Sequence, residues 1–212
     1  MANIDSKSSE FYAKHVKNIW ISTYDLDAFE RILRVCSGVQ NLLLFPIRSG
    51  FVYPFIPFLE DARAGSCLRR LTCTFAHLFA PGVEPNFSHA CFANLTHLHI
   101  CDEVEEWSTY VGFENLRSLT HLAFSCCEPQ ALAAVMPKLP ALQYVALCHY
   151  KTRSDFSFVS VNNEISQDVY GIRVVWIDGL TEEDWKHGAT GRKDFWDVVE
   201  QEVSRRYEGA FA

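Results

Sequence analysis

The amino-acid sequence predicts a single α/β domain, a short solenoid of about seven parallel strands with a C-terminal helical cap. Three observations support this prediction. A Leu-x-x-Leu-x-Leu pattern of apolar residues occurs seven times along the 212 residues. The segments between the copies contain short helical patterns or turn-forming residues, and an amphipathic helical pattern follows the last copy. Because about half of the residues are apolar, residues 1–212 suit one domain with a sizeable core.

The seven copies of the pattern begin 23 to 30 residues apart. They occupy residues 16–21, 39–44, 68–73, 95–100, 119–124, 142–147 and 172–177. This spacing is typical of leucine-rich repeats, in which each turn contributes one short strand and one connecting segment. The asparagine that such repeats place about three residues after the last leucine is absent here, so the backbone groups of the turns need other partners.

The segments outside the strands are expected to differ in regularity. Residues 1–15 form a candidate N-terminal cap, and the repeats fill residues 16–180. Residues 25–36 place apolar side chains on one helical face and stop at Gly38, which predicts a helix. Prolines limit residues 53–60 and 128–136 to short helical pieces.

Two longer connections are expected to be mostly irregular. Residues 80–94 contain two prolines and a glycine, which favours a loop. Residues 148–171 are the least regular, although the alternating run at 156–161 is compatible with a small extra strand.

The C-terminal residues 181–212 are expected to cap the solenoid. Thr181 is a plausible helix start, and residues 192–207 predict an amphipathic helix. Phe195, Val199, Val203 and Tyr207 recur every four residues on one face of it. A solenoid must cover its last apolar edge, so this helix is expected to lie there.

Composition excludes several classes of function. The formal net charge is −7 and there is no run of Lys or Arg, which argues against nucleic-acid binding. No apolar stretch of about 18 residues is present, so we expect no membrane span. Eight cysteines without a C-x-x-C pair indicate free thiols in a reducing compartment, the cytoplasm or the nucleus. A monomer is expected.

Several phrases of the sequence are similar to one known family. Residues 32–42, the two Leu-Thr-His-Leu units at 95 and 119, residues 140–147 and the tail at 174–200 resemble the leucine-rich regions of F-box-type proteins from mushroom-forming fungi. The likeness extends from about residue 11 to the C-terminal region. It implies a leucine-rich-repeat horseshoe and a link to the ubiquitin pathway through an F-box that docks on the Skp adaptor. About fifteen residues precede the first repeat, too few for an F-box helix bundle.

The repeat alignment predicts which side chains share the concave face of the sheet. Side chains alternate along a strand, so the third and fifth positions of each repeat point to the face opposite the core. The third-position row reads Asn18, Asn41, Arg70, His97, His121, Tyr144 and Val174. The fifth-position row reads Trp20, Leu43, Thr72, His99, Ala123, Ala146 and Trp176. The three histidines should therefore cluster near the centre of this face.

A recognition module that binds a protein or a small ligand on its concave face is the predicted function. The candidate ligand-binding residues are Arg70, His97, His99, His121, Tyr144, Trp20 and Trp176. Plain roles are also compatible with the sequence: the histidines as ordinary strand residues, and the tryptophans as packing under a cap.

Two alternatives remain open. The first is a small enzyme that uses the imidazoles for acid–base chemistry or ligand activation. Its candidate catalytic residues are His97, His99, His121, Cys101 and Tyr144. No dinucleotide, G-x-S-x-G or H-E-x-x-H motif is present, so we expect no cofactor and no resident metal, although converging imidazole nitrogens would be able to ligate one. The second is a ubiquitin-pathway adaptor without its own F-box.

Overall fold

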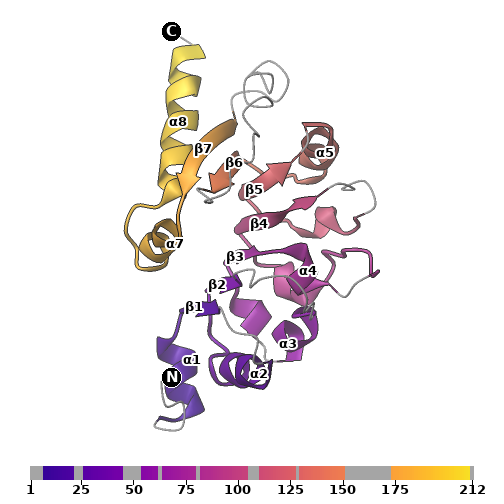
Figure 1. Cartoon of the computed structure of the whole chain (residues 1–212), viewed down its shortest axis with the longest axis vertical. Coiled ribbons are helices and arrows are strands. Elements are labelled where there is room, and N and C mark those ends of the chain that lie inside the picture. The colour runs from indigo at the N-terminus through magenta and orange to yellow at the C-terminus, as the bar shows by residue number, and fades with distance from the viewer. Residues whose placement is uncertain are drawn as a thin grey trace.

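A single parallel sheet organises the molecule (Figure 1). The computed structural model describes residues 7–21, 26–44, 54–61, 64–79, 82–104, 110–127, 129–150 and 173–210. The strands are β1 (Asn18–Ile21), β2 (Asn41–Leu44), β3 (Arg70–Cys73), β4 (His97–Val104), β5 (His121–Cys127), β6 (Tyr144–Tyr150) and β7 (Val174–Leu180). All seven are parallel and lie in sequence order. The predicted α/β class and the seven parallel strands are confirmed.

The register of the first six strands follows the repeat alignment. Arg70 pairs with Asn41 on one side and with His97 on the other, and His121 pairs with both His97 and Tyr144. The third positions of successive repeats are therefore neighbours across the sheet, and the predicted surface map holds from β1 to β6.

The last strand is shifted by one residue from the predicted alignment. Val174 pairs with Val145 instead of Tyr144, and Trp176 pairs with Leu147. A shift of one residue moves every side chain of a strand to the opposite face. Trp176 and Val174 therefore lie on the face opposite to the expected one, whereas Val175 and Ile177 join the side of His97 and His121. Four consecutive apolar residues, 174–177, lack the polar alternation that would have fixed the phase.

Backbone hydrogen bonds link the start of each strand to the preceding repeat. The carbonyl oxygen of the second repeat position accepts two backbone N–H groups of the next repeat. Thr96 O, for example, accepts from Thr120 N and His121 N, both at 3.0 Å. The same arrangement recurs at Lys17, Gln40, Arg69 and Thr120. These bonds provide hydrogen-bond partners for the backbone N–H groups at the start of each strand.

Helices and 3-10 turns pack on one face of the sheet and enclose the larger core. The α-helices on this face are α2 (Leu26–Val35), α3 (Ile56–Asp61), α4 (Phe75–Leu78) and α5 (Pro129–Val135), and α1 (Ser9–His15) packs beside α2 at the β1 end of the sheet (Figure 1). The 3-10 turns are η2 (Ala64–Cys67), η3 (Ala90–Phe92), η5 (Phe113–Asn115) and η6 (Met136–Lys138). This core contains the inward leucines of the repeats and a group of phenylalanines that includes Phe87, Phe92 and Phe113.

The expected connecting segments are largely found. The helix predicted at 25–36 is α2, and the short pieces at 53–60 and 128–136 correspond to α3 and to α5 with η6. Residues 82–94 have only the 3-10 turn η3 and an isolated bridge at Asn86. The run at 156–161 lies outside the described residues. No helix in the described ranges is long and apolar enough to cross a membrane.

The C-terminal helices cover the other face of the sheet rather than only its last edge. They are α7 (Glu182–Ala189) and α8 (Phe195–Ala210), and with the turn between them we call them the C-terminal cover. Figure 1 shows them on the side of the sheet opposite to α3, α4 and α5. We call the covered side, which bears His97, His99 and His121, the histidine face. The helix predicted at 192–207 corresponds to α8, which packs on β6 and β7, the last two strands of the sheet.

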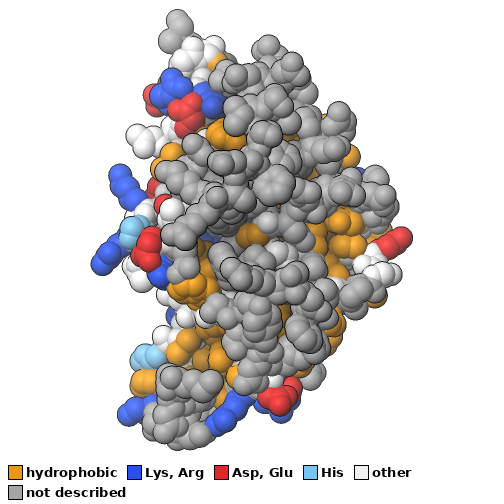
Figure 2. All heavy atoms as spheres, in the orientation of Figure 1, with side chains coloured by type: hydrophobic (Ala, Val, Ile, Leu, Met, Phe, Trp, Pro, Cys, Tyr) orange, Lys and Arg blue, Asp and Glu red, His pale blue; other side chains and the backbone are white. Residues whose placement is uncertain are grey.

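A second, smaller core joins the cover to the histidine face. It consists of Ala123, Ala146, Cys148, Val175, Leu180, Phe195, Trp196, Val199 and Val203. The small side chains Ala123 and Ala146 leave room for the aromatic residues of α8. Charged side chains of both signs line the outer edge formed by α7 and α8 in Figure 2, so the cover turns its polar side to solvent. Glu202, for example, pairs there with Arg205 and Arg206.

Candidate functional site

Two histidines and a tyrosine stack in a column across β4, β5 and β6. The ring centroids of His97 and His121 are 4.0 Å apart with an interplanar angle of 9°. The centroids of His121 and Tyr144 are 4.6 Å apart at 20°. The column follows from the register, because parallel neighbours at the same repeat position lie about 4.8 Å apart. Of the three histidines expected to cluster, His97 and His121 are thus stacked, with Tyr144 beside them.

Trp196 of α8 closes the column from the side of the cover. Its ring meets the rings of His97 and His121 edge-on, with centroid distances of 5.3 Å in both cases. Phe195, beside it, contacts the ring of His99 at 5.6 Å. The histidine face is therefore buried under aromatic side chains at its centre: His121 is 6% exposed and His99 is 3% exposed.

Each stacked histidine is oriented by the threonine that precedes it. Thr96 Oγ1 lies 2.8 Å from His97 Nδ1, and Thr120 Oγ1 lies 2.7 Å from His121 Nδ1. Both hydroxyls also lie within hydrogen-bond distance of a backbone carbonyl, Arg69 O at 3.0 Å and Thr96 O at 3.2 Å. A threonine hydroxyl can donate its proton to the carbonyl and accept from Nδ1–H, or donate it to an unprotonated Nδ1. Either imidazole tautomer is thus satisfied at Nδ1.

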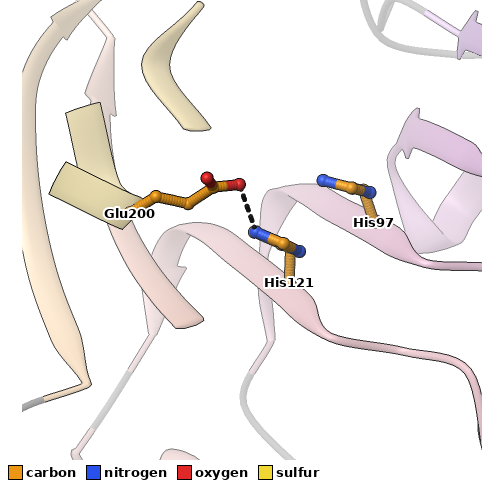
Figure 3. A group of neighbouring side chains, drawn as sticks. All are labelled: His97, His121 and Glu200. Carbon is orange, nitrogen blue, oxygen red and sulfur yellow. Dashed lines mark hydrogen bonds and ion pairs between the residues drawn. The ribbon is translucent and has the colours of Figure 1, made fainter. Parts of the chain in front are cut away.

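The other nitrogen of His121 faces a carboxylate of the cover. His121 Nε2 and Glu200 Oε1 are 3.0 Å apart, as Figure 3 shows. The Nε2 atoms of His97 and His121 project toward the same side as this carboxylate. One ligand atom from each of His97, His121 and Glu200 can be chosen so that all three atoms lie within 4.8 Å of one another.

Burial keeps the histidines uncharged at neutral pH. Loss of hydration, reinforced for His97 by His121 and by Arg70, lowers the pKa of His97 to about 2. Burial and the nearby Arg70 lower the pKa of His121 to about 4. Burial lowers the pKa of His99 to about 3, and its Nε2 lies 3.2 Å from Ser125 Oγ. All three side chains are neutral imidazoles near pH 7.

An ion pair fastens the start of α8 to the sheet. Arg70 Nη1 donates to Asp194 Oδ2 at 2.8 Å, and the Asp194 side chain is only 5% exposed. Asp194 also caps α8, because its Oδ1 accepts from Trp196 N at 2.9 Å. Gly188 of α7 packs directly against this pair: a Cβ at that position would lie 1.8 Å from Asp194 Oδ2. The pair therefore requires a glycine at 188.

A small, partly open pocket remains beside the ion pair. The sheet contributes Asn41, Arg70, Thr72 and His97, and the cover contributes Trp185 and Trp196. The pocket therefore combines hydrogen-bonding groups on its floor with two indole rings above them.

The other candidate residues predicted from the sequence lie at different places in the structure. Trp20 lies under α7, where Lys186 Nζ is 4.5 Å from its ring centroid. Trp176 is 41% exposed on the opposite face, so the structure separates it from the other candidate ligand-binding residues. Cys101 neighbours the buried Cys148, and burial raises the pKa of the Cys148 thiol well above its usual range, with Cys101 as a further cause.

Glu200, Asp194 and the tryptophans of the cover are functional candidates that sequence reasoning missed. Glu200 follows Trp196 by four residues and so shares its side of the helix, which is the one signal the sequence offers. That signal does not indicate that Glu200 meets His121, 79 residues earlier.

No protein-family model matches the chain, and neither a curated protein nor a solved structure was found to be similar to it.

Proposed function

We propose that the chain is a leucine-rich-repeat-like recognition module that binds a small polar or anionic ligand at the edge of its histidine face. The spacing of the repeats, their regular register and the ladder of shared carbonyls support the repeat architecture. The resemblance to F-box-type proteins of mushroom-forming fungi, and a place in the cytoplasm or nucleus, belong to the same proposal.

The covered face favours a small ligand over a protein partner. Phe195, Trp196, Val199 and Val203 are each at most 6% exposed. Burying a large apolar side chain contributes about 1.5–3 kcal/mol. Burial of the four side chains therefore opposes removal of the cover by at most about 12 kcal/mol. A protein that bound the whole histidine face would have to displace the cover against this stabilisation. The single observation that supports the proposal most is the pocket that the cover leaves open beside Arg70.

The chemistry of the pocket indicates the ligand class. Arg70 supplies a planar guanidinium with several N–H donors, and its side chain is 34% exposed although Asp194, which also lines the pocket, offsets part of its charge. Asn41 and Thr72 add neutral hydrogen-bonding groups, and the indole rings of Trp185 and Trp196 provide apolar walls. The enclosed space is only about 20 Å³, which is room for about one water-sized group, so the pocket admits one end of a small ligand rather than a whole molecule.

Acid–base catalysis is less well supported as a function. A general base works best when its pKa lies near the working pH. The pKa values of about 2 for His97, 3 for His99 and 4 for His121 are too low for this role at neutral pH. The ubiquitin-pathway adaptor depends on the resemblance alone.

The proposal is tested by nuclear magnetic resonance on the full chain, with inorganic phosphate and malonate as probes. We expect saturable shifts of the indole N–H signals of Trp185 and Trp196 with at least one of the probes. Arg70→Gln should weaken binding about tenfold or more, whereas Arg117→Gln, an exposed change outside the pocket, should leave it unaltered. The proposal would be overturned if the probes shifted only signals of residues outside the pocket. It would also be overturned if the Arg70→Gln variant bound the probes as tightly as the parent chain does.

A further inference from the structure

Side-chain atoms that can ligate a metal ion come together at His97, His121 and Glu200. Of these three residues, only His97 also lines the pocket beside Arg70. The two imidazoles come from neighbouring strands and the carboxylate from α8 (Figure 3). From this geometry we infer that the three side chains bind one divalent transition-metal ion, such as Zn²⁺, through His97 Nε2, His121 Nε2 and a carboxylate oxygen of Glu200.

The donor set suits such an ion. Two imidazole nitrogens and one carboxylate oxygen are the protein ligands of many zinc sites that keep a fourth position open. The carboxylate neutralises part of the ion's charge, and the positive charge of the nearby Arg70 is already offset by Asp194 at 2.8 Å. The Glu200 side chain is 48% exposed, so an ion can reach the site from solvent.

The hydrogen-bond partners of the two histidines also favour a metal. A metal ligand must be a neutral imidazole with a free lone pair. Both histidines have a threonine hydroxyl at Nδ1 that can accept a hydrogen bond from Nδ1–H, which leaves the lone pair on Nε2 free for a metal. A partner at the second ring nitrogen fixes the tautomer and orientation of metal-bound histidines. The repeated Leu-Thr-His-Leu phrase supplies this partner twice.

Binding requires a limited movement of the side chains. The ligand atoms lie within 4.8 Å of one another, whereas ligands of a tetrahedral zinc ion lie about 3.3 Å apart, given metal–ligand bonds of about 2.0–2.2 Å. The nearly parallel imidazole rings must therefore tilt toward each other, and Glu200, on a long side chain, must move closer. In the metal-free protein, His121 Nε2–H donates a hydrogen bond to Glu200 Oε1 at 3.0 Å. Metal binding would replace this hydrogen bond.

The test uses the full chain, freed of metal by a chelator, and titration with ZnCl₂ followed by calorimetry. We expect one ion per chain. Glu200→Gln and His121→Gln should each weaken binding by more than about 100-fold, and Thr120→Val, which removes the partner of Nδ1, by about 10- to 100-fold. Glu208→Gln and His187→Gln lie outside the group and serve as matched controls that should bind like the parent chain. Glu200→Gln changes an exposed, isosteric position, so its fold should persist, as circular dichroism would verify.

Cobalt(II) distinguishes this site from the free thiols of the chain. Ligation by nitrogen and oxygen gives visible d–d absorption without the sulfur-to-metal charge-transfer band of a thiolate. Absence of calorimetric binding, a charge-transfer band, or undiminished affinity in Glu200→Gln and His121→Gln would each overturn the inference. Because only the metal is titrated, this result is independent of whether phosphate or malonate binds beside Arg70.

Discussion

Acidification from pH 7 to pH 5 should destabilise the metal-free protein strongly. The reason is that His97, His99 and His121 remain neutral in the folded state, with pKa values of about 2, 3 and 4. The same side chains in the unfolded chain have pKa values near 6.5. Below pH 6.5 the unfolded state therefore binds more protons than the folded state, and the free energy of unfolding falls as the pH falls.

The size of this effect follows from the pKa differences. One pH unit is worth about 1.36 kcal/mol for each proton that only the unfolded state binds. At pH 5 each histidine lowers the free energy of unfolding by about 2 kcal/mol, and the three together by up to about 6 kcal/mol. Such a loss is comparable to the whole stability of a typical domain, which is about 5–15 kcal/mol.

Urea unfolding at pH 7, 6 and 5 in the presence of a chelator measures the effect through tryptophan fluorescence. The carboxylates of the unfolded chain titrate mainly below this range, so the histidines dominate the slope. His99→Leu should remove about a third of the pH dependence. A free energy of unfolding that stays constant between pH 7 and pH 5 would refute the neutral, buried state of the imidazoles.

Two further predictions concern the attachment of the cover and are checked by urea unfolding at pH 7. Gly188→Ala should destabilise the chain by about 1–3 kcal/mol, since the new Cβ would lie 1.8 Å from Asp194 Oδ2. The control Gly209→Ala, whose new Cβ would have no atom within 4 Å, should be neutral or slightly stabilising. Equal stability of the two variants would contradict the close packing of α7 on the ion pair. Trp196→Ala should lower the free energy of unfolding by about 3–5 kcal/mol because the Trp196 side chain is only 5% exposed. Trp176→Ala should lower it by less than about 1 kcal/mol because Trp176 is 41% exposed. A larger loss of stability for Trp176→Ala than for Trp196→Ala would contradict the burial of Trp196.

The sequence predicted the strands well because their signal is local. Each repeat fixes its own strand by the spacing of a few apolar residues, and a constant spacing then sets the neighbours. For this reason the column of His97, His121 and Tyr144 was predictable without a structure. The prediction failed at β7, where Val174 and Val175 are both apolar and either phase would bury one of them.

The cover was not predictable by the same means. The helical pattern of 192–207 identified an apolar face with Phe195, Val199 and Val203, but an apolar face does not reveal which surface it meets. The decisive features are long-range: the ion pair of Arg70 with Asp194, 124 residues apart in sequence, and the small side chains of Ala123 and Ala146 that admit the aromatic rings of α8. In the structure the chain's own C-terminal helix occupies the space that these small side chains leave.

The central claim is that α8 covers the histidine face in the free protein. Nuclear Overhauser effects between the indole protons of Trp196 and the imidazole protons of His97 and His121 test this claim most directly, because the ring centroids are only 5.3 Å apart. We predict cross-peaks from Trp196 to both imidazoles in the full chain. An assigned spectrum in which the Trp196 indole contacts neither imidazole would contradict the covered face, and with it the pocket and the metal site that α8 completes.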